Sequence, residues 1–231
     1  MSRTAHQRAI TRDSLGVGIA TGLYGASFGA ISVGAGLSVA QTCALSLLMF
    51  TGASQFALVG VLGSGGSAVS AALTAMLLGT RNTLYGLRVA PLLGWRGTRR
   101  TAAAQLLIDE STAMSVNRET RDDARLGFLV TGGSVFVLWN VFTALGALGG
   151  STIGDPRTYG LDAAVGGAFL ALLWPQLAST AHRVVALCAV AVALGLVPVT
   201  TAGVPVLAAG GVALLAGLLR TTPARPERRA P

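Results

Sequence analysis

The chain has 231 residues, of which 52% are hydrophobic and only 11% are charged. Because soluble domains carry about a quarter charged residues, this composition excludes an ordinary soluble protein and predicts an integral membrane protein. Two cysteines and two histidines form no metal-ligand or disulfide pattern. The sequence contains no nucleotide-binding loop, nucleophile elbow or zinc-protease motif, so we expect neither an enzyme nor a bound cofactor.

The net charge is +8, and all 17 basic residues are arginines. Most of them lie at the termini or in short segments between apolar runs, as the positive-inside rule requires of cytoplasmic loops. This distribution favours a role in membrane topology over nucleic-acid binding. It predicts a cytoplasmic segment of residues 1–13, a single transmembrane domain of residues 14–219 and a basic cytoplasmic tail of residues 220–231, which is disordered or lies on anionic lipid.

The first helix is predicted from Ser14 to Ile31. Small residues at positions 22, 25, 26 and 29 form one stripe along it, which would let another helix approach closely. Tyr24 lies in this stretch, where a packing role is favoured and a functional role stays open.

The second apolar segment, roughly residues 37–62, contains the sequence FTGASQF with no charged neighbour. One interpretation is a helix broken at Gly52, whose restarted half offers backbone amides to a carboxylate. The other is a regular helix in which Ser54 bonds its own backbone and Gln55 bonds a neighbouring helix. Spacing alone favours the regular helix and leaves both interpretations open.

A glycine- and serine-rich turn precedes an apolar stretch at residues 67–95, with Arg81 near its middle. Tyr85 shares the helical face of Arg81, and Asn82 is adjacent. A charge at this depth costs about 2.5 to 3.5 kcal/mol, which favours a functional or ion-pairing role. A single span here would place the arginine-rich segment 96–100 outside, so we predict a break near residues 79–82.

Residues 102–117 are too short and too polar for a lipid-facing helix, and they are predicted to be re-entrant or interfacial. Asp109 and Glu110 lie at their middle. Because neighbouring residues on a helix point about 100° apart, we expect one carboxylate to face a cavity and the other the cytoplasmic surface. Either could pair with Arg81, bind an ammonium group or take up a proton; a solvated surface carboxylate is the alternative.

Together these features predict an all-α polytopic integral membrane protein with about seven or eight transmembrane helices. Broken or re-entrant segments are expected near residues 50–55, 79–82 and 102–117. The last four helices are predicted at residues 127–149, 161–178, 183–197 and 204–219.

Four motifs occur along the chain: FTGASQFALVGVL, TRNTLYGLRVAP, IDES and YGLDAAVGGAFLALL. In their order and spacing they resemble the AzlC family of branched-chain amino acid exporters, from about Gly16 to Leu219. The resemblance implies a multi-pass permease of the bacterial inner membrane that exports leucine, isoleucine, valine and related amino acids such as methionine, coupled to the proton gradient. It also implies a partner, a small membrane subunit of the AzlD type.

The resulting hypothesis places an amino-acid site in the membrane interior. The broken helix and the face of Arg81 would bind the substrate carboxylate, and Asp109 or Glu110 would bind its ammonium group or carry the proton. A passive channel for small solutes and a membrane scaffold without transport activity stay open as alternatives. The candidate site residues are Gly52, Ser54, Gln55, Arg81, Asn82, Tyr85, Asp109 and Glu110.

Overall fold

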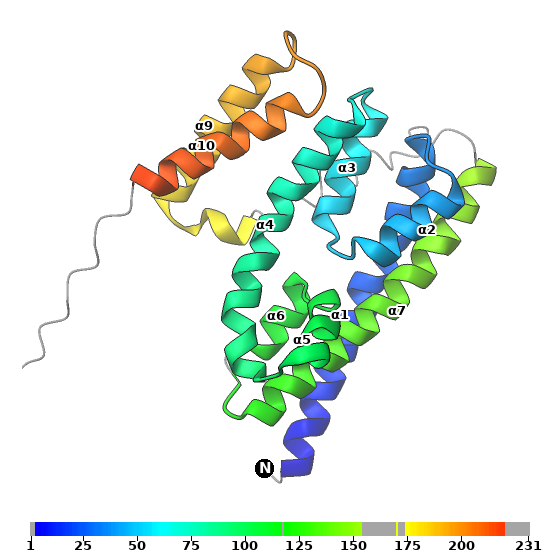
Figure 1. Ribbon diagram of the computed structural model, residues 1–231, viewed down its shortest axis with the longest axis vertical. Coiled ribbons are helices and arrows are strands. Elements are labelled where there is room, and N and C mark those ends of the chain that lie inside the picture. The colour runs from blue at the N-terminus through cyan, green and yellow to red at the C-terminus, as the bar shows by residue number, and fades with distance from the viewer. Residues whose placement is uncertain (1–2, 117, 154–169, 171–173, 220–231) are drawn as a thin grey trace, which may run out of the picture.

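The computed structural model describes residues 3–116, 118–153, 170 and 174–219, and all regular structure within these ranges is helical (Figure 1). This confirms the predicted all-α class for the described part of the chain. Three long helices frame the bundle: α1 (Arg3–Gly34), α4 (Ala68–Leu93) and α7 (Arg121–Ile153). The shorter elements are α2 (Val39–Leu48), α3 (Ala53–Gly63), α5 (Gly97–Gln105), α6 (Asp109–Ser115), η2 (Trp174–Ala178), α9 (Thr180–Leu196) and α10 (Val204–Leu219).

Helices α1 and α7 lie side by side along most of their length (Figure 1). Gly22, Gly25 and Gly29 of α1 face α7 so closely that a Cβ atom on any of them would overlap α7 atoms. Gly146 of α7 faces Ala26 of α1 in the same way. The predicted stripe of small residues is therefore the surface on which α1 packs against α7.

Helices α1 and α7 both extend beyond their predicted ranges. The first helix begins at Arg3 instead of near Ser14, because the polar residues before Ser14 continue the helix towards the start of α7. There, His6 Nε2 lies 3.7 Å from Asp123 Oδ2. The start of α7 is fixed by Thr120, whose hydroxyl accepts a hydrogen bond from the backbone N–H of Asp123 (3.1 Å).

Helices α2 and α3 form a hairpin, the first hairpin (residues 39–63), that begins and ends at the same end of the bundle (Figure 1). Gly63, where α3 ends, lies beside Ala35, just after the end of α1. The chain turns back at residues 49–52, inside the bundle. This confirms the predicted break near residues 50–55, and it shows that the segment returns instead of crossing the bundle.

Helix α4 is continuous from Ala68 to Leu93, so the predicted break near residues 79–82 is wrong. The prediction assumed that the preceding apolar segment crosses the membrane once. Since the first hairpin returns, an unbroken α4 brings the arginine-rich residues 96–100 to the end of the bundle where α1 begins (Figure 1). A straight α4 therefore places these arginines where the positive-inside rule requires them, and no break is needed.

Helices α5 and α6 form a second hairpin (residues 97–115), which enters from the end of the bundle where α1 begins (Figure 1). Its base is closed by Arg125 at the start of α7, whose Nε donates to the carbonyl oxygen of Leu93 at the end of α4 (2.8 Å). Its tip, residues 106–108, lies inside the bundle. The prediction that residues 102–117 turn back is confirmed for the described residues, which omit residue 117.

Helices α9 and α10 form a separate pair beside α4, joined to it by a hydrogen bond from Ser70 Oγ to the carbonyl oxygen of Ala202 (3.0 Å). They match the helices predicted at 183–197 and 204–219, whereas most of the helix predicted at 161–178 lies outside the described residues. In the described part, two helices are long and apolar enough to cross a membrane, one within α1 and one within α7. The expected seven or eight spans are therefore not confirmed.

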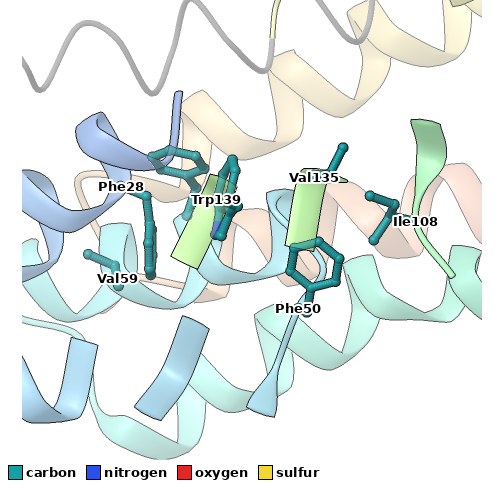
Figure 2. Close-up of a cluster of buried hydrophobic side chains, with 7 residues drawn as sticks. Phe28, Phe50, Val59, Ile108, Val135 and Trp139 are labelled. Carbon is teal, nitrogen blue, oxygen red and sulfur yellow. The ribbon is translucent and has the colours of Figure 1, made fainter. Parts of the chain in front are cut away.

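The core of the bundle gathers where the two hairpin tips meet α1 and α7. Figure 2 shows Phe50 and Ile108, one from each tip, beside Val135 of α7. Close van der Waals packing of these apolar side chains holds both tips against α7. The buried cluster consists of Phe28, Phe50, Phe56, Val59, Ile108, Val135 and Trp139.

Candidate functional site

Arg81, near the middle of α4, contacts the tips of both hairpins. Its Nη2 lies 2.8 Å from Asp109 Oδ2, at the start of α6. The same nitrogen donates a hydrogen bond to the carbonyl oxygen of Thr51 in the first hairpin (3.1 Å). The side chains of Arg81 and Asp109 are only 25% and 28% exposed, so the ion pair lies largely inside the protein.

Further hydrogen bonds join the same three elements. Asn82 Nδ2 donates to the carbonyl oxygen of Leu107 (3.2 Å), and Gln105 Nε2 donates to that of Leu47 (2.8 Å). Tyr85, one turn after Arg81 on α4, lies near the Asp109 carboxylate. The free carbonyl groups that each chain reversal leaves at a hairpin tip are thus bound by polar side chains.

The break in the first hairpin is tied together by Gln55. Its side chain is fully buried; Oε1 accepts from the backbone N–H of Gly52 (3.0 Å), and Nε2 donates to the carbonyl oxygen of Leu45 (3.3 Å). One amide therefore bonds both half-helices. Gln55 holds the hairpin shape and does not line the cavity described below.

Gly52 takes a backbone conformation that other residues rarely adopt, with φ +60° and ψ −85°. We expect Gly52→Ala to lower the free energy of unfolding by about 1 to 3 kcal/mol, through backbone strain alone, because nothing lies within 4 Å of the added Cβ. Gly60→Ala, within α3 and equally open, should cost nothing because alanine favours the helix. The thermal unfolding midpoint in detergent measures both, and equal midpoints would contradict this role of Gly52.

A cavity of about 410 Å³ lies between the two tips and helices α1 and α7. Asp109 and Glu110 both line it, so the expectation that only one carboxylate would face a cavity is wrong. Asp109 and Glu110 are the first two residues of α6. The cavity lies at this end of the helix instead of along one side of it, so both carboxylates reach the cavity. The other lining residues are Ala20, Thr21, Tyr24, Phe50, Thr51, Gly52, Ala53, Phe56, Ile108, Val135 and Trp139.

The charges around the cavity are unequal. Arg81 neutralises Asp109, whereas Glu110 has no ion-pair partner among the described residues; Thr21 of α1 lines the same cavity near its carboxylate. The first turn of α3, which starts at Ala53, also borders the cavity and presents backbone N–H groups without helical partners. The cavity therefore offers one carboxylate for a cation and one helix start for an anion.

Several buried polar atoms around the tips have no hydrogen-bond partner among the described residues. Leaving such a group unpaired costs about 1 to 3 kcal/mol, so buried groups of this kind usually bind a water molecule, an ion or a ligand. They are Thr51 Oγ1, Ser54 Oγ, Arg81 Nε, Asn82 Oδ1, Thr112 Oγ1 and Trp139 Nε1.

The structure brings all the predicted site residues to the two tips and the middle of α4. Gly52, Asp109 and Glu110 line the cavity; Ser54 is buried next to Gly79 of α4, at the contact between α3 and α4. The remaining predicted residues, Gln55, Arg81, Asn82 and Tyr85, support the tips from behind the cavity wall.

Sequence reasoning missed Thr21 and Trp139, which line the cavity from α1 and α7. Neither residue belongs to a motif. Their positions follow only from the packing of α1 on α7, so no local pattern could have indicated them.

The model of the AzlC protein family matches residues 16–153, which contain both hairpins, α4 and most of α1 and α7. The chain is 36% identical to an uncharacterized membrane protein of Archaeoglobus fulgidus over 170 residues, 73% of this chain and 74% of the relative. It is 31% identical to the inner membrane protein YgaZ of Escherichia coli over 191 residues, 80% of this chain and 77% of the relative. No solved structure matches the chain. The chain therefore belongs to the AzlC family of membrane proteins.

Proposed function

We propose that this protein exports hydrophobic amino acids, namely leucine, isoleucine, valine and methionine, from the cavity between the two hairpin tips. The observation that carries the proposal is the pairing, in one cavity, of an unneutralised carboxylate with a helix start. Free amino acids carry an ammonium group and a carboxylate on neighbouring atoms, so they match both features at once.

In the proposed complex, Glu110 binds the ammonium group and Thr21 orients the Glu110 carboxylate. The substrate carboxylate meets the N–H groups at the start of α3, where Gly52 lets the chain approach closely. In this proposal Arg81 holds Asp109 in place, 2.8 Å away, and does not itself bind the substrate.

The substrate side chain lies against the aromatic wall of Tyr24, Phe56 and Trp139. Tyr24 and Trp139 both pack on Phe56, with ring centroids 5.2 and 6.1 Å apart. A cavity of about 410 Å³ falls within the range of small-molecule sites. Because one methylene group is worth only about 1 to 3 kcal/mol in an apolar pocket, such a wall accepts leucine, isoleucine, valine and methionine alike.

Export against a gradient needs coupling, and we assign the proton to the pair Asp109 and Glu110. Two carboxylates beside one arginine can hold a proton when substrate is absent and release it when an ammonium group binds. A collapsed proton gradient should then stop uphill efflux.

We assign the protein to the bacterial inner membrane, with both termini in the cytoplasm. The arginines of α1, of residues 96–100 and of the start of α7 all lie at one end of the bundle, which the positive-inside rule places in the cytoplasm. A small membrane subunit of the AzlD type is the proposed partner. Exposed leucines on α4 and α9, such as Leu84 and Leu187, offer apolar surface for it or for lipid.

We expect Glu110→Gln to lower leucine export by about ten- to a hundredfold, because a hydrogen bond to a charged group is worth about 1.5 to 3 kcal/mol. Glu119→Gln, an exposed glutamate outside the cavity, is the matched control and should export normally. The measurement is leucine efflux from cells preloaded with a leucine-containing dipeptide, with and without the small subunit, at equal amounts of membrane-inserted protein. Unchanged efflux by Glu110→Gln would refute the proposed site.

A further inference from the structure

A groove runs between α4 and α5 from the arginine-rich end of the bundle towards its middle. Two adjoining cavities of about 430 and 540 Å³ form it, and they share Gly86, Leu87, Ala90, Trp95 and Arg100 as lining residues. The inner end of the groove is lined by Asn82 and Leu107. The groove therefore leads to the tip of the second hairpin.

The tip of the second hairpin separates this groove from the central cavity. Leu107 lines the groove, whereas its neighbours Ile108 and Asp109 line the central cavity. At this point the partition is one turn of chain between α5 and α6, which packs against Gly132 of α7 through Leu106.

Several polar contacts hold this turn closed, among them the ion pair between Arg81 and Asp109 at its end (2.8 Å). Asn82 binds the carbonyl oxygen of Leu107 from α4 (3.2 Å), and Gln105 anchors the end of α5 to Leu47 of the first hairpin (2.8 Å). Ser111 braces the turn internally by donating to the carbonyl oxygen of Leu106 (2.6 Å). Next to the ion pair of Arg81 and Asp109, the bond between Asn82 and Leu107 is the hydrogen bond that joins α4 to the backbone of residues 106–108.

The mouth of the groove carries positive charge and its wall is apolar. Arg96, Arg100 and Arg121 line the mouth, and none of them forms an ion pair with another described residue. The wall includes Val89, Leu93, Leu107 and Phe128. A ligand with a carboxylate and an apolar side chain fits this combination.

We infer that the groove between α4 and α5 is the cytoplasmic access path and an outer binding site for the amino acid, and that the turn at Leu107 is its gate. This inference rests on the proposed function for the identity of the ligand. Opening requires Asn82 to release the Leu107 carbonyl, after which the groove and the central cavity are continuous. The arginines hold the carboxylate of the waiting substrate at the mouth.

Thiol labelling tests the path without relying on transport. In the full chain carrying Cys43→Ala and Cys188→Ala, a single cysteine is placed in the groove (Ala103→Cys) or in the central cavity (Thr21→Cys). A membrane-impermeant cationic thiosulfonate reagent is then added to vesicles that expose one end of the bundle or the other. We expect both cysteines to react from the arginine-rich end, and the one in the cavity to react more slowly.

The gate is tested by adding Asn82→Ala or Asn82→Asp to the variant with Thr21→Cys. Each removes the donor to Leu107, so labelling from the arginine-rich end should rise about fivefold, the effect of one hydrogen bond on a two-state equilibrium. Asn140→Ala is the matched control, because Asn140 Nδ2 bonds only within α7, to the carbonyl oxygen of Phe136 (2.8 Å). Labelling of Ala103→Cys reports an intact fold and should not change.

The inference is overturned if Thr21→Cys reacts only from the opposite end, or if neither substitution of Asn82 changes its rate. Leucine should slow the labelling of Ala103→Cys, a position outside the proposed contacts of the central cavity. If leucine has no effect while Asn82→Ala still opens the cavity, the access path stands and the amino-acid function fails.

Discussion

Replacing Arg81 by glutamine should destabilise the protein and abolish export, and replacing Asp109 by asparagine in the same chain should restore stability but not export. The single variant leaves Asp109 without its partner, 2.8 Å away in the wild type, and next to a second carboxylate. Breaking a fully buried ion pair costs about 3 to 5 kcal/mol, whereas replacing both partners is often nearly neutral. Because about a quarter of each side chain is exposed, we expect about 2 kcal/mol here.

The measurements for Arg81→Gln are the thermal midpoint in detergent, the amount of inserted protein and leucine efflux. The double variant distinguishes a structural role of the ion pair from a role of Asp109 in transport. A double variant that is stable and exports at the wild-type rate would reduce Arg81 and Asp109 to a structural ion pair, as in a membrane scaffold. A stable double variant without export would place Asp109 in the transport site.

Replacing Gly29 by leucine should disrupt the contact between α1 and α7. A Cβ atom at Gly29 would overlap the backbone of α7 at Thr143, and backbone cannot move aside as a side chain can. Overpacking costs about 1 to 3 kcal/mol where side chains can shift, so we expect about 3 kcal/mol or more here. Folded protein in the membrane should fall to a small fraction of the wild-type amount.

Gly16→Leu is the control for this experiment. Gly16 lies on the same helix, and nothing lies within 4 Å of an added Cβ, so the substitution should leave the thermal midpoint unchanged. If Gly29→Leu is as stable as Gly16→Leu, the close approach of the two helices is wrong.

Composition and periodicity were sufficient to predict an all-helical protein with interruptions near residues 50–55 and 102–117. They failed at α4 because a charge pattern reports only on which side a loop lies, not on how many times the chain crossed before it. A returning segment and a crossing segment have the same apolar composition. The prediction took residues 37–62 to cross the membrane once. The break predicted at residues 79–82 was needed only because of that assumption.

The candidate site was predictable where a residue is costly in an apolar setting. Arg81 and Asp109 stood out for that reason, and the structure pairs them. Their mutual roles were not predictable, since sequence distance does not reveal that α6 begins at Asp109 and points its carboxylates into the same cavity. Nothing in the sequence distinguishes Thr21 from other helical threonines, because its place at the cavity depends on where α6 packs.

The hydrogen bonds between the tips also set an order of events during synthesis. Arg81 leaves the ribosome before Asp109, and the Leu47 carbonyl is made long before Gln105, which binds it in the finished protein. Until Asp109 has been made, Arg81 has no counter-charge, a state that costs about 2.5 to 3.5 kcal/mol inside a bilayer. The nascent chain therefore stays incompletely assembled until the second hairpin has been translated. Only then can Gln105 and Asp109 bind their partners in the first hairpin and in α4.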